Sequence, residues 1–193
     1  MKFFVNFLSV FRIVSAFAII PLLMFQMFGV AFYLFIAASA SDWFDGYLAR
    51  KFNATSKLGG VLDHIGDKLL VTNALIMAIM FLQIWSVIIP AVIMICRELY
   101  VSGLREFMGT QKIAMPVPKY RFSFGKVKAA TQMIALTAMF LWIWAVNADW
   151  SSEFLTYYML FIATGGLWLA TLFSVISAGQ YTGTFIQNLK KIK

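Results

Sequence analysis

Four aspartates stand close together in a chain that is otherwise strongly apolar. Asp42, Asp45, Asp63 and Asp67 are half of the eight acidic residues in the 193-residue sequence. Ionisable side chains in membrane-spanning segments are costly, and their default interpretation is functional. Carboxylates that approach one another repel unless a cation joins them, and clustered carboxylate oxygens suit Mg²⁺, Mn²⁺ or Ca²⁺. Because Mg²⁺ is commonly shared with substrate phosphates, the cluster predicts metal-dependent phosphate chemistry.

The spacing of the aspartates predicts two helix faces. Asp42 and Asp45 are three residues apart, and Asp63 and Asp67 are four apart, so each pair shares one face of a helix. Two antiparallel helices joined by a short loop would bring all four carboxylates together. A structural alternative is ion pairing with nearby basic residues, namely Arg50, Lys57 and Lys68.

The composition that surrounds the cluster is that of an integral membrane protein. Apolar residues make up 62% of the chain and charged residues 12%, whereas a soluble domain carries about 25% charged residues. Six stretches reach the roughly 20 residues that a spanning helix needs, and they cover 6–27, 29–50, 60–82, 85–108, 124–146 and 153–177. We therefore expect an all-α bundle of six transmembrane helices, one domain over residues 1–193, with a retained first helix rather than a cleaved signal peptide.

Basic residues alternate with the predicted spans. The turns near 27–30, 82–86 and 147–153 contain no Lys or Arg, whereas the two termini and the loops near 50–57 and 109–123 are rich in them. The positive-inside rule then places both termini, both longer loops and the aspartates at the cytoplasmic side. In this setting the net charge of +8 favours anionic membrane lipids as partners over nucleic acid.

The cysteine and three tryptophans fit the same interpretation. Cys96 lies in an apolar run and is expected to be a small buried residue. Trp85, Trp144 and Trp150 lie near the ends opposite the basic loops, where they are expected to anchor the helices at the membrane interface.

Small residues and an arginine complete a longer motif. It reads Asp42-x2-Asp45-Gly46-x2-Ala49-Arg50-x8-Gly59-x3-Asp63-x3-Asp67. This pattern resembles the signature of the CDP-alcohol phosphatidyltransferase family at all eight fixed positions. The segments CRELYVSGLREFM, GKVKAATQM and NFLSVFR are similar to bacterial members whose acceptor is sn-glycerol 3-phosphate, and the similarity covers most of the chain.

The resemblance implies a reaction and a role for each residue of the motif. A phosphatidyl group would pass from CDP-diacylglycerol to sn-glycerol 3-phosphate, giving phosphatidylglycerol phosphate and CMP. The four aspartates would surround two divalent cations, Mg²⁺ or Mn²⁺, and Asp67 would also be the base that takes the proton of the attacking hydroxyl. Gly46, Ala49, Arg50 and Gly59 would line the CDP-lipid site, although such small residues also favour plain helix packing. A homodimer in the bacterial inner membrane is expected.

The acceptor phosphate needs cations of its own. Arg97 and Arg105 are eight residues apart and share a helix face, and Lys126 and Lys128 open the fifth predicted helix. The glutamate that follows each arginine is placed to orient it. The alternative is that these cations are ordinary positive-inside anchors.

Two residues and two other functions stay open at this point. Arg12 either faces the site or extends its charge to the interface, and His64, where many relatives have proline, either titrates near the site or faces a neighbouring helix. A different acceptor, phosphatidylglycerol or inositol phosphate, would keep the family and change the product. A cation transporter is disfavoured because no chain of polar groups continues from the aspartates to the far side.

Overall fold

The chain folds into six α-helices in a computed structural model that describes residues 2–51, 57–111, 124–149 and 152–189. Within these ranges, side chains are described for all residues except 2–5, 42–43, 45–51, 57–58 and 124–126. The helices are α1 (Lys2–Met24), α2 (Phe28–Lys51), α3 (Lys57–Leu82), α4 (Trp85–Thr110), α5 (Phe124–Asn147) and α6 (Glu153–Leu189). The described ranges contain no strand, so the expected all-α class is confirmed.

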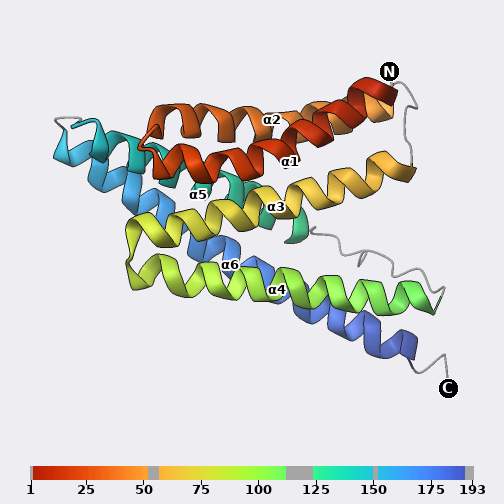
Figure 1. Ribbon diagram of the computed structural model, residues 1–193. Coiled ribbons are helices and arrows are strands. Elements are labelled where there is room, and N and C mark those ends of the chain that lie inside the picture. Colours follow the sequence, from red (N-terminus) through yellow and green to blue (C-terminus); the bar gives the residue numbers. More distant parts are fainter. Residues whose placement is uncertain (1, 52–56, 112–123, 150–151, 190–193) are drawn as a thin grey trace.

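Three tight turns reverse the chain at one end of the bundle. Gln26, Gln83 and Asp149 occupy them with φ of 60°, 49° and 49°, a left-handed conformation that unbranched side chains tolerate far better than β-branched ones. The helices that each turn joins are antiparallel, and the start of α1 and the end of α6 therefore lie at the opposite end (Figure 1). Both termini thus share one side of the bundle, as an even number of spans requires.

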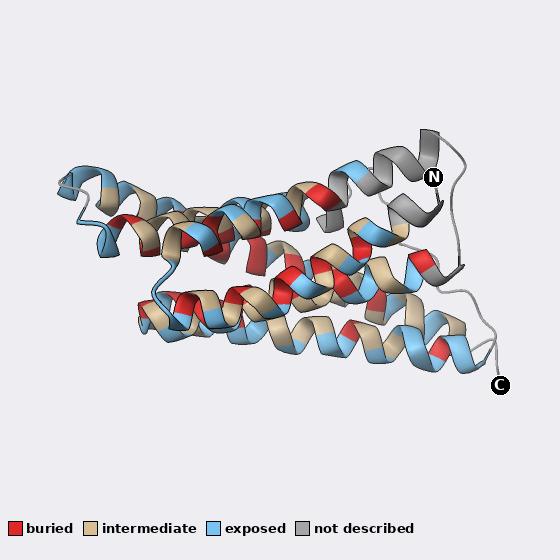
Figure 2. Ribbon diagram, turned by 45° about the horizontal axis from the view of Figure 1, so that its top comes forward, coloured by how far each residue is buried: buried red, intermediate tan, exposed pale blue. Residues whose placement is uncertain are grey.

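The outward faces of the helices are apolar. Five of the helices are long and apolar enough to cross a membrane, and the described apolar part of α2 is the shorter segment Phe28–Ser41. Large side chains such as Trp85, Phe161 and Leu172 are exposed by 74%, 65% and 57%, and exposed residues recur along the outward sides of the helices (Figure 2). A patch of this extent would be unstable in water, so the chain is a multi-pass membrane protein.

One burial prediction is wrong. Cys96 is exposed rather than buried, because an apolar sequence around a residue does not distinguish lipid contact from protein contact in a membrane helix. Trp144 of α5 is half-buried against α2, and its ring centre lies 5.6 Å from those of Phe32 and Tyr33. Trp85 is exposed at its helix end as expected.

Helix α6 is longer than predicted. It continues past residue 177 to Leu189, because tertiary contacts with α4 extend the helix where its apolar pattern ends. The hydroxyl groups of Tyr100 and Thr182 are 3.0 Å apart, and the rings of Phe107 and Phe185 are in edge contact at 5.7 Å. This extension carries one wall of the site described below.

Helix α1 packs against both α2 and α3, and the direct contact between α2 and α3 is small within the described residues (Figure 1). The two helices α1 and α3 approach closely at Gly66, where an added Cβ would lie 3.4 Å from Arg12 Cδ and from the Ser9 carbonyl oxygen. Asn73 Nδ2 also donates to the Ala16 carbonyl oxygen at 2.9 Å. The aspartate-bearing face of α3 is therefore held against α1, which the sequence did not predict.

Candidate active site

Two of the four aspartates share a buried guanidinium from α1. Arg12 Nη1 donates to Asp63 Oδ1 at 2.7 Å and to Asp67 Oδ1 at 2.6 Å. The Arg12 side chain is fully buried, whereas the two carboxylates are 43% and 40% exposed. Asp63 and Asp67 therefore lie side by side on one face of α3, as their spacing predicts, and Arg12 faces the site rather than the interface.

The charge balance of this group suits a divalent cation. Arg12 brings one positive charge to two carboxylates, and both carboxylates are partly exposed. Carboxylate oxygens are the ligands that Mg²⁺ and Mn²⁺ prefer. The side chains of Asp42 and Asp45 lie outside the described residues, and among the described ones no group of three candidate ligands occurs. The residues present fit a divalent cation that Asp63 and Asp67 approach from one side.

A cationic cavity opens next to these aspartates. It measures about 270 Å³, and α3, α4, α5 and α6 all contribute to it. The residues that line it are His64, Lys68, Arg97, Glu98, Val101, Ser102, Arg105, Lys128, Ala129, Ser177 and Tyr181. Four of these side chains are basic and one is acidic, so the cavity is suited to an anion with several oxygen atoms, such as a phosphate.

The two arginines of the cavity are held by α6. Arg97 Nε donates to the Ser174 carbonyl oxygen at 3.1 Å, and its Nη2 donates to Ser177 Oγ at 3.0 Å. Arg105 Nη2 donates to Tyr181 Oη at 2.6 Å, and its guanidinium lies 4.8 Å from the centre of the Tyr181 ring. These contacts fix the direction of both forks before any ligand arrives, which lowers the entropy cost of binding.

Glu98 joins the arginine of α4 to the lysine of α5. Its Oε1 accepts a hydrogen bond from Arg97 Nη1 at 3.0 Å and forms an ion pair with Lys128. The prediction that this glutamate orients Arg97 is confirmed. Lys68 donates to the hydroxyl of Ser102, so each of the four cations has a defined position at the cavity wall.

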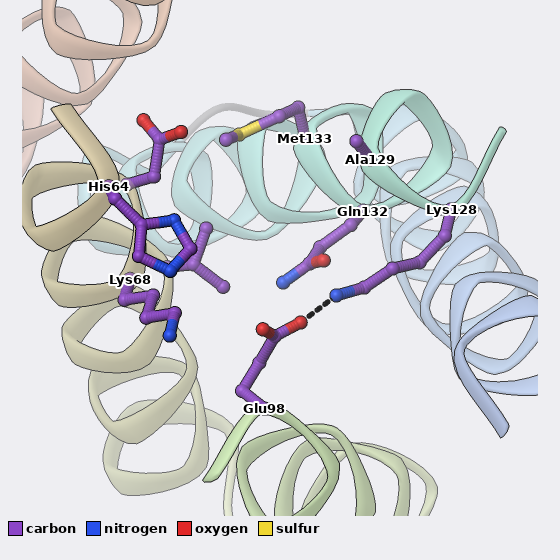
Figure 3. A pocket seen from close by; sticks show the side chains of 9 residues that line it. His64, Lys68, Glu98, Lys128, Ala129, Gln132 and Met133 are labelled. Carbon is purple, nitrogen blue, oxygen red and sulfur yellow. Dashed lines mark hydrogen bonds and ion pairs between the residues drawn. The ribbon is translucent and has the colours of Figure 1, made fainter. Parts of the chain in front are cut away.

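A second cavity connects the cations with Asp67. It measures about 200 Å³ and shares His64, Lys68, Glu98, Lys128 and Ala129 with the first. Its other lining residues are Asp67, Val71, Gln132 and Met133. In Figure 3, His64 and Lys68 approach from α3, Glu98 from α4, and Lys128 and Gln132 from α5. A small molecule with an anionic end at the arginines can thus extend toward the Asp67 carboxylate.

The structure describes only part of the predicted site. It brings Asp63 and Asp67 together and places Arg97 and Arg105 in one cavity. Gly59 is buried near the start of α3. The side chains of Asp42, Asp45, Gly46, Ala49, Arg50 and Lys126 lie outside the described residues.

Lys128, one of the cations expected to bind the acceptor phosphate, lines both cavities. Three further lining residues, Ser177, Tyr181 and Gln132, have no role in the sequence prediction. The spacing of Ser174, Ser177 and Tyr181 puts polar groups on one face of a predicted apolar helix, and that pattern could have indicated them. The exposed His64 lines both cavities.

The helical bundle and its acidic and basic groups agree with the sequence motif, and a comparison with known protein families identifies the family of the chain. The family model of the CDP-alcohol phosphatidyltransferases matches residues 3–176 of the sequence. The chain belongs to the CDP-alcohol phosphatidyltransferase family, which is generally dependent on divalent metal ions.

Similar curated proteins carry one shared name, CDP-diacylglycerol–glycerol-3-phosphate 3-phosphatidyltransferase. The protein from Haemophilus influenzae is 33% identical, and the match covers 95% of this chain and 96% of that one. The Yersinia enterocolitica protein is 36% identical over 67% of this chain and 68% of its own length. The Escherichia coli K12 protein is 39% identical over 60% of this chain and 63% of its own.

Proposed function

We propose that this protein transfers a phosphatidyl group from CDP-diacylglycerol to sn-glycerol 3-phosphate, forming phosphatidylglycerol phosphate and CMP. The observation that carries the proposal is the cationic cavity of Lys68, Arg97, Arg105 and Lys128, which continues to Asp67. Its size is below the roughly 300–1,000 Å³ of pockets for drug-sized ligands, so it suits a small phosphorylated alcohol better than a second lipid. The names of the similar proteins support the same donor and acceptor.

The proposed reaction is an in-line displacement at the phosphorus that carries the diacylglycerol. The primary hydroxyl oxygen of the acceptor forms the new bond to phosphorus, and the bond between phosphorus and the CMP oxygen breaks. The hydroxyl proton passes to the Asp67 carboxylate, and CMP leaves with the bonding electrons. The arginine forks hold the acceptor phosphate, so their contribution is to position the hydroxyl for attack.

Asp42, Asp45, Asp63 and Asp67 are proposed to hold two divalent cations, Mg²⁺ or Mn²⁺. Such ions neutralise a pyrophosphate and stabilise the leaving oxygen. The residues proposed to line the CDP-lipid site are those of the motif, Gly46, Ala49, Arg50 and Gly59. Arg12 holds Asp63 and Asp67 in place from the side of α1.

We further propose that the site faces the cytoplasm from the inner membrane of a bacterium and that the enzyme is a homodimer. The orientation follows from the basic residues at the end of the bundle that carries the termini. This location lets the acyl chains of the donor stay in the bilayer while the charged groups react at its boundary. The cation-transport alternative loses its support because the chain belongs to a transferase family.

The direct test uses purified full-length protein in detergent with CDP-diacylglycerol, Mg²⁺ or Mn²⁺, and radiolabelled acceptors. We expect lipid-soluble label and stoichiometric CMP with sn-glycerol 3-phosphate. Parallel reactions with inositol phosphate and phosphatidylglycerol serve as acceptor controls. Product with one of these and none with glycerol phosphate would refute the acceptor while keeping the family. Absence of CMP with every alcohol would refute the transferase activity.

A further inference from the structure

An amide nitrogen without a hydrogen-bond partner among the described residues lies in the wall between the cations and Asp67. Gln132 is only 3% exposed, and its Nε2 is buried with no partner in the described structure. The residue comes from α5, and its side chain points into the cavity beside Glu98 and Lys128 (Figure 3). Buried polar groups in proteins are nearly always satisfied, so an exception requires a specific explanation.

The surroundings of Gln132 point to a ligand rather than to a packing defect. It is the third of four α5 residues that line the cavity, after Lys128 and Ala129 and before Met133. An apolar residue of the same length would fill this place without a desolvation penalty. An unpaired buried N–H group destabilises the protein without substrate. When such a group faces a cavity, this is typical of a donor that forms its hydrogen bond only when substrate binds.

The chemistry at the two ends of the cavity limits which ligand atom can pair with Gln132. In the proposed function, the phosphate of the acceptor lies among the arginines and its attacking hydroxyl lies at Asp67. Gln132 lines the cavity that contains Asp67, whereas it does not line the one that contains both arginines. An N–H group placed there requires an oxygen acceptor from the middle or the reacting end of the molecule.

We propose that Gln132 is a specificity-determining residue whose Nε2 donates a hydrogen bond to the secondary hydroxyl of the acceptor. The inference rests on the proposed function and deepens it, because it defines the substrate class as a phosphorylated polyol with a free hydroxyl between the phosphate and the reacting carbon. An alcohol phosphate without that hydroxyl leaves the amide unpaired, and it is therefore discriminated against.

The test compares sn-glycerol 3-phosphate with 3-hydroxypropyl phosphate, which has the same chain and phosphate but no secondary hydroxyl. A single neutral hydrogen bond corresponds to about a tenfold preference in kcat/KM for the wild-type protein. Gln132→Met keeps the side-chain length and removes the donor, so we expect it to lose most of this preference. The kcat/KM for sn-glycerol 3-phosphate should fall, whereas the kcat/KM for 3-hydroxypropyl phosphate should stay the same.

Two controls separate recognition from folding. Asn188→Leu removes another amide whose nitrogen has no partner in the described structure and which lines neither cavity, so the acceptor preference should be retained. The Tm of Gln132→Met in detergent should equal or exceed that of the wild type, because an unsatisfied donor has been removed. A lower Tm together with an equal loss for both acceptors would indicate a structural role and overturn the proposal.

The remaining outcomes are equally decisive. Gln132→Leu serves as a second variant without the amide. If both variants still use sn-glycerol 3-phosphate and still prefer it to 3-hydroxypropyl phosphate as the wild type does, the role of Gln132 is overturned and the proposed function stands. Absence of CMP release from wild-type protein with either acceptor would overturn both proposals at once. We expect both Gln132 variants to lose the preference for sn-glycerol 3-phosphate and to keep a Tm at least as high as that of the wild type.

Discussion

Replacing Arg12 by methionine should destabilise the protein in a way that depends on divalent cations. The guanidinium is fully buried, and its Nη1 contacts Asp63 Oδ1 at 2.7 Å and Asp67 Oδ1 at 2.6 Å. Methionine has a similar length and retains apolar contact, so the variant removes the charge together with these two hydrogen bonds. In the metal-free protein both carboxylates then lose the cation that they share.

The magnitude follows from the exposure of the partners. A hydrogen bond to a charged group contributes about 1.5–3 kcal/mol net, and two such bonds are lost. Because the carboxylates are 43% and 40% exposed, water replaces part of the interaction, and we expect a loss of about 2–3 kcal/mol. For a chain of this size that corresponds to a Tm decrease of roughly 4–12 °C.

The assay is thermal unfolding in detergent, followed by tryptophan fluorescence, in chelator and again with Mn²⁺. Cations that bind the folded state stabilise it by mass action, and Arg12→Met frees the carboxylates from a competing positive charge. Mn²⁺ should therefore raise the Tm of the variant more than that of the wild type. Leu23→Ala, a buried α1 residue that is 1% exposed, is the matched control and should lose the same stability with or without Mn²⁺.

An equal Mn²⁺-induced shift in wild type and Arg12→Met would refute the reasoning, because it would mean that Arg12 and the cation do not share these carboxylates. Arg12→Lys keeps the charge without the planar fork, and it should fall between the other two proteins.

Three further results are expected. Asp67→Asn should reduce CMP release by about 10³-fold, as removal of a base from a site does, and should lower the Tm by less than Arg12→Met, because it weakens only one of the two Arg12 contacts; substantial remaining turnover would exclude Asp67 as the base. Arg105→Ala should raise the KM for glycerol 3-phosphate by about tenfold or more with a small change in kcat, and Tyr181→Phe, which removes only the Oη that accepts from Arg105, should raise it by less; an unaltered KM in Arg105→Ala would return this arginine to a membrane-anchoring role. Glu98→Gln leaves the cations of the cavity without their shared carboxylate, so its Tm should fall by several degrees and recover in part when inorganic phosphate is added; a Tm insensitive to phosphate would argue against an anion site.

The local pattern of the chain was sufficient for the class of fold and for the acidic pair on α3. Apolar runs of spanning length predict helices because the bilayer leaves the backbone no other partner than itself. Asp63 and Asp67 share a face because residues four positions apart are neighbours on the surface of any α-helix. The eight-position motif led to the family, and the match of residues 3–176 confirms that prediction.

The limits of the sequence prediction are seen where two helices meet. Positions buried in protein and positions facing lipid are both apolar in a membrane helix, so the burial of Cys96 was predicted incorrectly. The end of α6 was placed too early because contacts with α4, rather than hydropathy, maintain its last turns.

The sequence by itself determined that carboxylates and cations would stand near the basic end of six membrane helices. Only the tertiary structure decided how they are connected. It placed α1 against α3, so that Arg12 pairs with Asp63 and Asp67, and it joined Lys128 of α5 to Glu98 of α4. Helix spacing defines which residues share a face, but the partner of that face is a long-range choice that depends on packing volume and charge across the whole bundle.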